Sequence, residues 1–206
     1  MKYIYLCRHG ESEYNAKKIV QGHIDTQLTE KGIKQAKALG EFLKDKNIQK
    51  IVSSDLKRAY QTAKTVADIL GLQVNVDERV REMHFGTWEG LSYDWIYQNA
   101  KDHFYNWLSN PVKHPLPKQE DPHHFEKRLR LFWEDIKKSK EENILIVGHG
   151  GSIQGLLCIV MNLGIECLWK FRHDNTGLSL VLSNNSKDEV KFINLSFHTE
   201  KDFRLL

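Results

Sequence analysis

The sequence predicts an α/β fold, with three α/β/α layers around a mostly parallel central sheet and a small helical cap insertion. Two observations carry this prediction. Short apolar runs typical of buried strands alternate with longer stretches of helical periodicity, which favours a parallel sheet. In addition, two of these runs end in a histidine followed by glycine, at His9-Gly10 and at His149-Gly150. Ligands collect at the carboxyl ends of parallel strands, so both histidines indicate a site at that edge.

The composition limits the kinds of partner that we expect. A chain of 206 residues can bury a substantial core, and we predict one domain over residues 1–206 with a helical, proline-rich cap insertion at about 92–122. The formal net charge of +3 is too small to indicate nucleic acid or a membrane surface as the main partner. We find neither an apolar leader nor an apolar run long enough to cross a bilayer, and we expect a cytoplasmic protein.

The spacing of cysteines and histidines does not favour a metal site. Cys7, Cys158 and Cys167 have neither metal-ligand spacing nor the even number of a disulfide framework, so we expect buried free thiols. A further group of histidines lacks an HExxH-like pairing or a cysteine partner. This group consists of His103, His114, His123, His124, His173 and His198. We therefore predict no metal and no other cofactor.

The first part of the chain predicts three strands and two helices. The strands are expected at residues 3–7, 50–52 and 72–76, where apolar residues cluster or alternate. Thr29 is the expected N-cap of the first long helix. The apolar face of that helix is predicted to contain Ile33, Ala36, Leu39 and Leu43. The second helix is expected to follow the capping residues Ser53-Ser54-Asp55, to run to about Leu70 and to stop at Gly71.

A loop and a cap are expected in the middle of the chain. Residues 77–90 predict a loop, and residues 93–108 predict one or two short helices that are dense in aromatic side chains. These aromatic residues are expected to form local core, and the leaving-group pocket is their alternative role. All four prolines of the chain fall in the following linker, where they exclude a long helix or a central strand. They are Pro111, Pro115, Pro117 and Pro122.

The last part of the chain returns to the sheet. A helix is expected from about residue 123 to 138, with its apolar side toward the core. The most strand-like run of the sequence, residues 143–147, follows and is predicted to lie at the centre of the sheet. A helix to about residue 163 and two strands, at 178–183 and 190–195, complete the fold.

The two strand-end histidines suit phosphoryl transfer. A transferred phosphoryl group carries negative charge on its non-bridging oxygens, so cleavage without a metal requires several fixed cations or donors around one nucleophile. Arg8, Arg58 and His149 are the candidates for this cradle, and the Asn15 amide is a further candidate donor. Arg58 lies near the end of the second strand and can reach the same edge as His9, although a solvent-facing helix position is the alternative.

His9 is our candidate nucleophile, because one nitrogen of an imidazole can be held by a hydrogen bond while the other attacks phosphorus. The leaving oxygen requires a proton and the hydrolytic water requires a base. Glu82, in the loop before Gly86, is our choice for both tasks. Glu11 and Glu13 are rivals because they follow His9 closely in the sequence.

Four sequence blocks carry a resemblance to a known family. They are Arg8-His9-Gly10-Glu11-Ser12, Ser53-Ser54-Asp55-Leu56-Lys57-Arg58-Ala59, Glu82 with Phe85-Gly86-Thr87-Trp88-Glu89-Gly90, and Val147-Gly148-His149-Gly150-Gly151. In this order, over residues 3 to about 165, they resemble the histidine phosphatase superfamily in its phosphoglycerate-mutase-like branch. The resemblance implies a phosphoglycerate-mutase-like fold for this chain.

The resemblance also implies roles for individual residues. It implies a phosphohistidine at His9, a proton donor at Glu82, and a phosphate pocket of Arg8, Asn15, Arg58 and His149. We add four neighbouring residues to the substrate- and phosphate-binding set, namely Gln21, Gly22, Gly150 and His84. For His84, packing within its own loop is the competing interpretation.

The block after Glu82 favours a phosphatase over a mutase. Residues 85–90 resemble the phosphatase members, particularly the α-ribazole-5′-phosphate phosphatases of cobalamin synthesis. His84 stands where those members usually carry an aspartate, and Gln119-Glu120-Asp121 stands where many relatives have Gly-Glu-Ser. We expect a metal-independent phosphatase for a small organic phosphate monoester, with α-ribazole 5′-phosphate as a candidate. A phosphoserine phosphatase and a cofactor-dependent phosphoglycerate mutase are the alternatives.

Two non-catalytic classes fit the sequence less well. The glycine-rich turn 148–151 suggests a nucleotide-binding module, but its spacing matches neither GxGxxG nor GxxxxGK[ST]. A scaffold that only binds phosphorylated partners would not need the complete set of His9, His149 and Glu82. We therefore expect a small phosphorylated metabolite as partner. Monomer and homodimer both stay open, because the tail at residues 197–200 can either close the site or pair with a second subunit.

Overall fold

The computed structural model of the chain describes residues 1–184 and 186–196, and a six-stranded sheet forms its centre. The strand order is β3-β2-β4-β1-β5-β6. The strands are β1 (Lys2–Arg8), β2 (Lys50–Ser53), β3 (Val74–Val76), β4 (Asn143–Gly148), β5 (Leu178–Ser183) and β6 (Asp188–Leu195). Strands β1 to β4 pair in parallel, whereas β5 is antiparallel to both β1 and β6. The predicted mostly parallel sheet is confirmed, with 143–147 at its centre.

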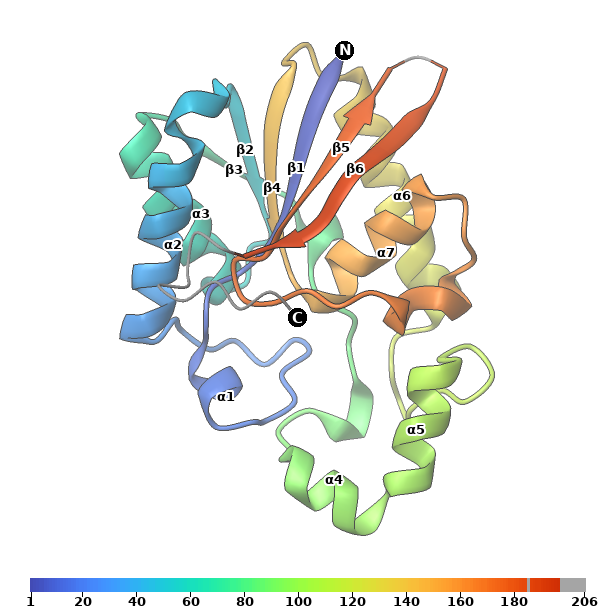
Figure 1. The fold of residues 1–206 in the computed structure, drawn as a ribbon. Helices are drawn as coiled ribbons and strands as arrows, with labels where there is room; N and C mark the ends of the chain where they lie inside the picture. Colours follow the sequence, from blue (N-terminus) through green and yellow to red (C-terminus); the bar gives the residue numbers. More distant parts are fainter. Residues whose placement is uncertain (185, 197–206) are drawn as a thin grey trace.

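Helices cover both faces of this sheet (Figure 1). Helices α2 (Glu30–Leu43) and α3 (Lys57–Leu70) lie on one face, and α6 (Pro122–Lys138) and α7 (Gly150–Val160) lie on the other. The short helices α4 (Tyr93–Asn99) and α5 (Lys101–Ser109) lie beyond the ends of β1 and β4, in the segment for which we predicted a cap. The predicted three-layer arrangement is confirmed, and the cap helices stand on the side where the strand-end histidines emerge.

The two central strands are buried on both faces because their side chains alternate between two cores. In β1, Ile4 and Leu6 belong to the core beneath α6 and α7, whereas Tyr5 and Cys7 belong to the core beneath α2 and α3. The residues of β4 divide in the same way. Because β1 and β4 are held from both sides, the residues at their carboxyl ends have a rigid support.

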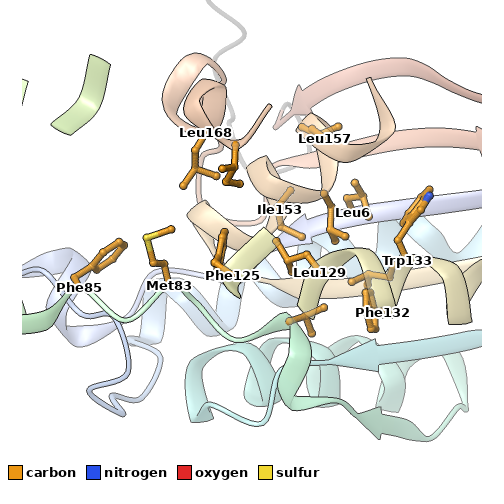
Figure 2. Packing of buried hydrophobic residues seen from close by; sticks show 14 of the residues in the cluster. Leu6, Met83, Phe85, Phe125, Leu129, Phe132, Trp133, Ile153, Leu157 and Leu168 are labelled. Atoms are coloured by element: carbon orange, nitrogen blue, oxygen red, sulfur yellow. The ribbon is translucent and has the colours of Figure 1, made fainter. Parts of the chain in front are cut away.

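The first of the two cores continues toward the loop that carries Glu82. Figure 2 shows Met83 and Phe85 beside Phe125, at one end of a cluster that continues along α6. Met83 is fully buried. Since the residue directly after Glu82 is anchored in the core, the position of Glu82 is fixed by packing as well as by hydrogen bonds.

A close contact between backbones explains the glycine after His9. Gly10 is not among the residues with positive φ, so its backbone conformation does not require a glycine. A Cβ atom at Gly10 would lie 2.6 Å from the carbonyl oxygen of Gly32 in α2. Likewise, a Cβ atom at Gly32 would lie 2.1 Å from the carbonyl oxygen of Glu11. Both glycines therefore allow the loop after β1 to lie directly against the first turn of α2.

Five details of the sequence predictions were wrong. Ser53-Ser54-Asp55 do not cap α3, whose N-cap is Leu56 without a side-chain hydrogen bond. Ile33 is 40% exposed, because at about 100° per residue it lies roughly 60° away from Ala36 and further from the rest of the apolar face. The third strand begins at Val74, since the N–H group of Leu72 still caps α3 through the carbonyl of Ala67. Helix α7 ends at Val160, before the left-handed Asn162. Cys167 is only half-buried, although all three cysteines are free thiols.

The predictions for the tail at residues 197–200 lie outside the described residues. Within residues 1–184 and 186–196, every helix is too short or too polar to cross a membrane.

We predict that α6 contributes to stability through one face only. Leu129 is fully buried in the core, so Leu129→Ala is expected to lower the free energy of unfolding by about 2–5 kcal/mol. Leu131 is 55% exposed on the same helix, and Leu131→Ala is expected to change the free energy of unfolding by less than about 0.5 kcal/mol. Denaturant unfolding measures both variants. Equal losses would contradict the assignment of the buried face.

Candidate active site

A cavity of about 210 Å³ lies at the carboxyl ends of the parallel strands. Its lining brings together segments that are far apart in the sequence: the end of β1 and the loop after it, the first turns of α3 and α7, the Glu82 loop and the cap. Eight of the ten predicted site residues line it, namely Arg8, His9, Asn15, Gln21, Gly22, Arg58, Glu82 and Gly150. The remaining two, His149 and His84, are placed differently.

The ring of His9 is held in one tautomer. Its Nδ1 atom lies 2.7 Å from the carbonyl oxygen of Gly10, and because a carbonyl only accepts hydrogen bonds, Nδ1 carries the hydrogen. Burial, followed by the positive charges of Arg58 and Arg8, lowers the pKa of His9 well below its usual 6.5. The neutral ring therefore has a lone pair on Nε2, which is the form a nucleophilic histidine requires.

Arg58 is a buried cation and not a solvent-facing residue of α3. Its side chain is 1% exposed, and it donates hydrogen bonds to the carbonyl oxygens of Gly22 (2.7 Å) and Ile24 (3.0 Å). Burial lowers the pKa of Arg58 to about 10, an effect that the negative charge of Glu82 opposes. Arg58 thus stays charged at neutral pH, and its buried Nε atom has no hydrogen-bond partner.

Arg8, which is half-buried, is the second cation of the cavity. It donates a hydrogen bond of 2.6 Å to the carbonyl oxygen of His173, and its buried Nε atom also has no partner. Burial lowers the pKa of Arg8, and the charge of Glu82 acts in the opposite direction. Unpaired buried N–H groups of a guanidinium are costly unless an acceptor reaches them. The two arginines therefore favour an anion in the cavity.

A loop before β5 holds the backbone of the Arg8-His9 pair. The N–H group of Thr176 donates to the carbonyl oxygen of Arg8 (3.0 Å). The amide of Asn175 donates to the carbonyl oxygen of His9 and to Oδ1 of Asn15, both at 3.1 Å. The sequence analysis assigned no role to this loop. Its residues 175–177 are typical of a turn, but nothing in their spacing indicates that the turn contacts the end of β1.

His149 lies directly behind His9 and not on the cavity wall. The two rings pack edge to face, with centroids 5.2 Å apart. Nε2 of His149 shares a hydrogen bond of 2.9 Å with the hydroxyl group of Ser54, whereas Nδ1 is buried without a partner. Burial and the charges of Arg58 and His9 lower the pKa of His149 well below 6.5. A neutral His149 can both pack against His9 and offer one further polar nitrogen.

Glu82 is held at both its carboxylate and its backbone. Oε2 accepts the N–H group of Gly151 at 3.0 Å, in the first turn of α7, where the helix dipole favours negative charge. Arg128 of α6 donates to the carbonyl oxygen of Glu82 at 2.8 Å and also to the carbonyl oxygens of Arg79 and Arg81. Arg128 also pairs with the carboxylate of Glu120. This clamp keeps the carboxylate of Glu82 in the cavity, where it is only 8% exposed.

The structure separates Glu82 from its rivals and His84 from the cavity. Glu11 forms an ion pair with Lys31 and accepts a hydrogen bond from Thr29, so its carboxylate helps to hold the loop against α2. Glu13 is exposed in α1 (Glu13–Ala16). His84 accepts the N–H group of Gly86 and packs edge to face against His23. His84 does not line the cavity. This agrees with the competing interpretation, in which His84 packs within its own loop.

The loop after β1 supplies the polar part of the wall. Gln21 is buried, and its Oε1 accepts hydrogen bonds from the hydroxyl groups of Ser12 and Thr26, both at 2.7 Å. Its predicted role in substrate binding therefore competes with a role in holding this loop. Gly22 reaches the site through its carbonyl oxygen, which orients Arg58.

The wall opposite the arginines is largely apolar, and the sequence analysis identified it only in part. The aromatic residues of α5 that line it are Phe104 and Trp107, both buried, as expected for aromatics that serve as core or as a leaving-group pocket. Sequence reasoning missed Gln154 and Trp169, which also line the cavity. Gln154 lies one helical turn after Gly150, so the spacing of four residues could have indicated it. No local pattern marks Trp169.

Within residues 1–184 and 186–196, no cluster of histidine, cysteine and acidic side chains is arranged to hold a metal ion. The cations of the site are the arginines themselves.

The chain is similar to two curated relatives over nearly its whole length. It is 48% identical to "Putative phosphoserine phosphatase 2" of Hydrogenobacter thermophilus, covering 98% of this chain and 99% of the relative. It is 29% identical to the adenosylcobalamin/alpha-ribazole phosphatase of Escherichia coli, covering 93% of this chain and 95% of the relative.

Solved structures agree with these similarities. A mycobacterial glucosyl-3-phosphoglycerate phosphatase superposes with a TM-score of 0.88 at 29% identity, covering 95% of this chain and all of that one. A phosphoserine phosphatase from Entamoeba histolytica, solved in complex with phosphoserine, superposes with a TM-score of 0.84 at 27% identity. The alignment covers 96% of this chain and 99% of that one.

The family described as histidine phosphatase superfamily (branch 1) matches residues 4–196, a range that contains all the cavity-lining residues. Relatives and structural neighbours named as phosphatases extend this match to the type of reaction. The chain therefore belongs to the histidine phosphatase superfamily and is a phosphoric monoester hydrolase.

Proposed function

We propose that the protein hydrolyses a small organic phosphate monoester through a phosphohistidine at His9, without a metal ion. One observation carries the proposal. Two guanidinium groups, that of the buried Arg58 and that of the half-buried Arg8, each have a buried Nε atom without a partner. They line the same cavity as a histidine whose tautomer leaves Nε2 unprotonated. This arrangement suits a dianionic group that is attacked by nitrogen.

The first step follows from the positions of these groups. Arg8 and Arg58 bind the non-bridging oxygens of the phosphoryl group, and Nε2 of His9 attacks phosphorus on the side opposite the ester oxygen. A P–N bond forms while the P–O bond to the leaving group breaks. Glu82 gives its proton to the leaving oxygen, so that an alcohol departs and an alkoxide does not. The arginine charges compensate the charge that develops on the phosphoryl oxygens.

The second step reverses the role of Glu82. The carboxylate that remains takes a proton from a water molecule, and this water attacks the phosphohistidine. The P–N bond breaks, inorganic phosphate leaves, and Nε2 of His9 recovers its lone pair. Fixed cations at Arg8 and Arg58 supply the stabilisation that a metal ion provides in other phosphatases.

Two leaving groups remain candidates, each with an observation in its favour. The apolar wall around Phe104 and Trp107 suits an aromatic leaving group, as in α-ribazole 5′-phosphate. The 48% identical relative carries a phosphoserine phosphatase name, and a structural neighbour was solved with phosphoserine. The values of kcat/KM for these two esters distinguish the two candidates. The same measurement on 3-phosphoglycerate with its bisphosphate cofactor tests for mutase activity.

We predict turnover of p-nitrophenyl phosphate in the presence of EDTA, together with an acid-labile phosphoenzyme that is absent from His9→Ala. His114→Ala is the matched control, because this histidine is exposed in the linker and should leave both signals intact. Rapid quenching with ³²P-labelled substrate measures the intermediate. No turnover by the wild type would contradict the proposed function, and a phosphoenzyme in His9→Ala would contradict the nucleophile.

We predict that Glu82→Gln slows hydrolysis of alkyl phosphates by about 10²–10⁴-fold. The loss on p-nitrophenyl phosphate should be much smaller, because p-nitrophenolate leaves without a proton. Glu11→Gln and Glu13→Gln are the controls, since neither carboxylate lines the cavity. Steady-state kcat on both ester types measures the contrast. Equal losses on both esters in Glu82→Gln would assign the proton to another acid.

We predict that kcat/KM falls on the acid side of its pH profile, and that this acid limb lies below pH 6.5. The reason is that Nε2 of His9 stays unprotonated until the pH falls through the lowered pKa of His9. Arg58 is one of the charges that lower this pKa, so Arg58→Gln should move the limb upward. Lys57→Gln, at the exposed neighbouring residue, should not. The substrate p-nitrophenyl phosphate also titrates, but it does so equally in assays of the wild type and both variants, so it does not affect the comparison of their acid limbs. A limb that stays in place in Arg58→Gln would contradict the assigned electrostatics.

A further inference from the structure

Two buried polar atoms on the cavity wall have no part in the phosphoryl chemistry described above. They are Oε1 of Gln154, in α7, and Nε1 of Trp169, in the turn η4 (Ile165–Lys170). Neither has a hydrogen-bond partner within the protein, and both residues line the cavity. Gln154 is only 6% exposed. Leaving such groups unpaired is costly, so their presence indicates a partner in the bound substrate.

The amide of Gln154 lies beside the groups that act on the ester oxygen. A Cβ atom built on Gly150 would lie 3.7 Å from Oε2 of Glu82, 3.8 Å from Nε2 of Gln154 and 3.9 Å from Nε of Arg8. The proton donor, the phosphate ligand and the amide therefore all lie within van der Waals range of the same point on Gly150. An atom of the leaving group within one or two bonds of the ester oxygen comes within reach of Gln154.

Trp169 closes the same corner of the cavity. Its ring packs against Trp107 with centroids 4.7 Å apart and against Phe85 at 6.1 Å. Its Cη2 atom is 3.2 Å from the position that a Cβ atom on Gly151 would occupy, next to Gly150. The indole nitrogen offers a hydrogen-bond donor, and the amide oxygen of Gln154 offers an acceptor. Both are neutral polar groups of residues that line the cavity, among mostly apolar neighbours.

The charge of the cavity lining decides which chemical group suits this pair. Among the described residues that line the cavity, only Arg8, Arg58 and Glu82 are charged, apart from the ring of His9. All three are engaged in the phosphoryl chemistry. A carboxylate or an ammonium group on the leaving group would be buried without an opposite charge of its own, which is unfavourable. A hydroxyl group donates and accepts at once, so it satisfies both the amide oxygen and the indole N–H group.

We propose that Gln154 and Trp169 form a specificity site for a neutral hydroxyl group on the leaving alcohol, close to the ester oxygen. The substrate class is then the phosphate monoester of a polyhydroxy compound, such as a sugar or a nucleoside, with the apolar wall for any ring that it carries. This inference rests on the proposed phosphatase function and narrows its substrate. Of the two candidate leaving groups above it favours the hydroxyl-bearing one of α-ribazole 5′-phosphate, and it disfavours serine, which carries both an ammonium and a carboxylate group.

A pair of esters with the same carbon skeleton tests the proposal. Glycerol 1-phosphate carries hydroxyl groups beside its ester, and propyl phosphate carries none. We expect the wild type to have a kcat/KM at least about 10-fold higher for glycerol 1-phosphate, since one well-placed hydrogen bond corresponds to roughly that factor. Gln154→Leu should reduce this ratio by about 10-fold. Trp169→Phe, which keeps a ring and removes the N–H group, should also reduce it.

The controls distinguish the possible failures. Gln98→Leu, at an exposed glutamine of α4, should keep the wild-type ratio. The absence of p-nitrophenyl phosphate turnover in the wild type would refute the proposed function itself. Turnover of that ester with the same glycerol-to-propyl ratio in the wild type, Gln154→Leu and Trp169→Phe would overturn the specificity site alone. Because the two substitutions lie in different elements, a folding defect in one, detected by thermal unfolding, leaves the other as the test.

Discussion

The enclosure of two arginine Nε atoms beside an unprotonated histidine is the constraint on which the rest of the site depends. The buried Arg58 and the half-buried Arg8 lose hydration, and carbonyl oxygens of His173, Gly22 and Ile24 replace only part of it. Their unpartnered Nε atoms favour an anion. The same charges lower the pKa of His9 and keep it nucleophilic. In the proposed mechanism, one arrangement therefore binds the phosphoryl group and prepares the atom that attacks it.

The surrounding fold supplies the rigidity that this arrangement requires. Strands β1 and β4 are packed on both faces, and the loop after β1 lies against α2 through Gly10 and Gly32. The proton donor comes from a separate loop, which is held by the buried Met83 and by Arg128 of α6. Nucleophile and acid are thus fixed by different parts of the core and meet only in the cavity. Such preorganisation matters because a misplacement of about 1 Å costs roughly 100-fold in rate.

The site divides into a general part and a selective part. Around the phosphoryl position the groups are charged and tightly held, and any phosphate monoester can engage them. Toward the leaving group the wall is aromatic, with Gln154 and Trp169 as neutral hydrogen-bonding groups. Selectivity among phosphate esters then depends on hydrogen bonds that some leaving groups satisfy and others leave unpaired. This division is consistent with a family whose members carry names that specify different phosphate substrates.

Local patterns in the sequence determined the elements and most of the residues that we propose to contact phosphate. The alternation of strands and helices predicts the sheet, and histidines after two strands predict the edge where His9 stands, since parallel strands end on one side. Only the tertiary structure placed His149 behind His9, brought Asn175 and Thr176 to the end of β1, and assigned His84 to its own loop. It also revealed Trp169 on the cavity wall. These contacts join residues far apart in the chain, and their geometry follows from packing, which no local periodicity records.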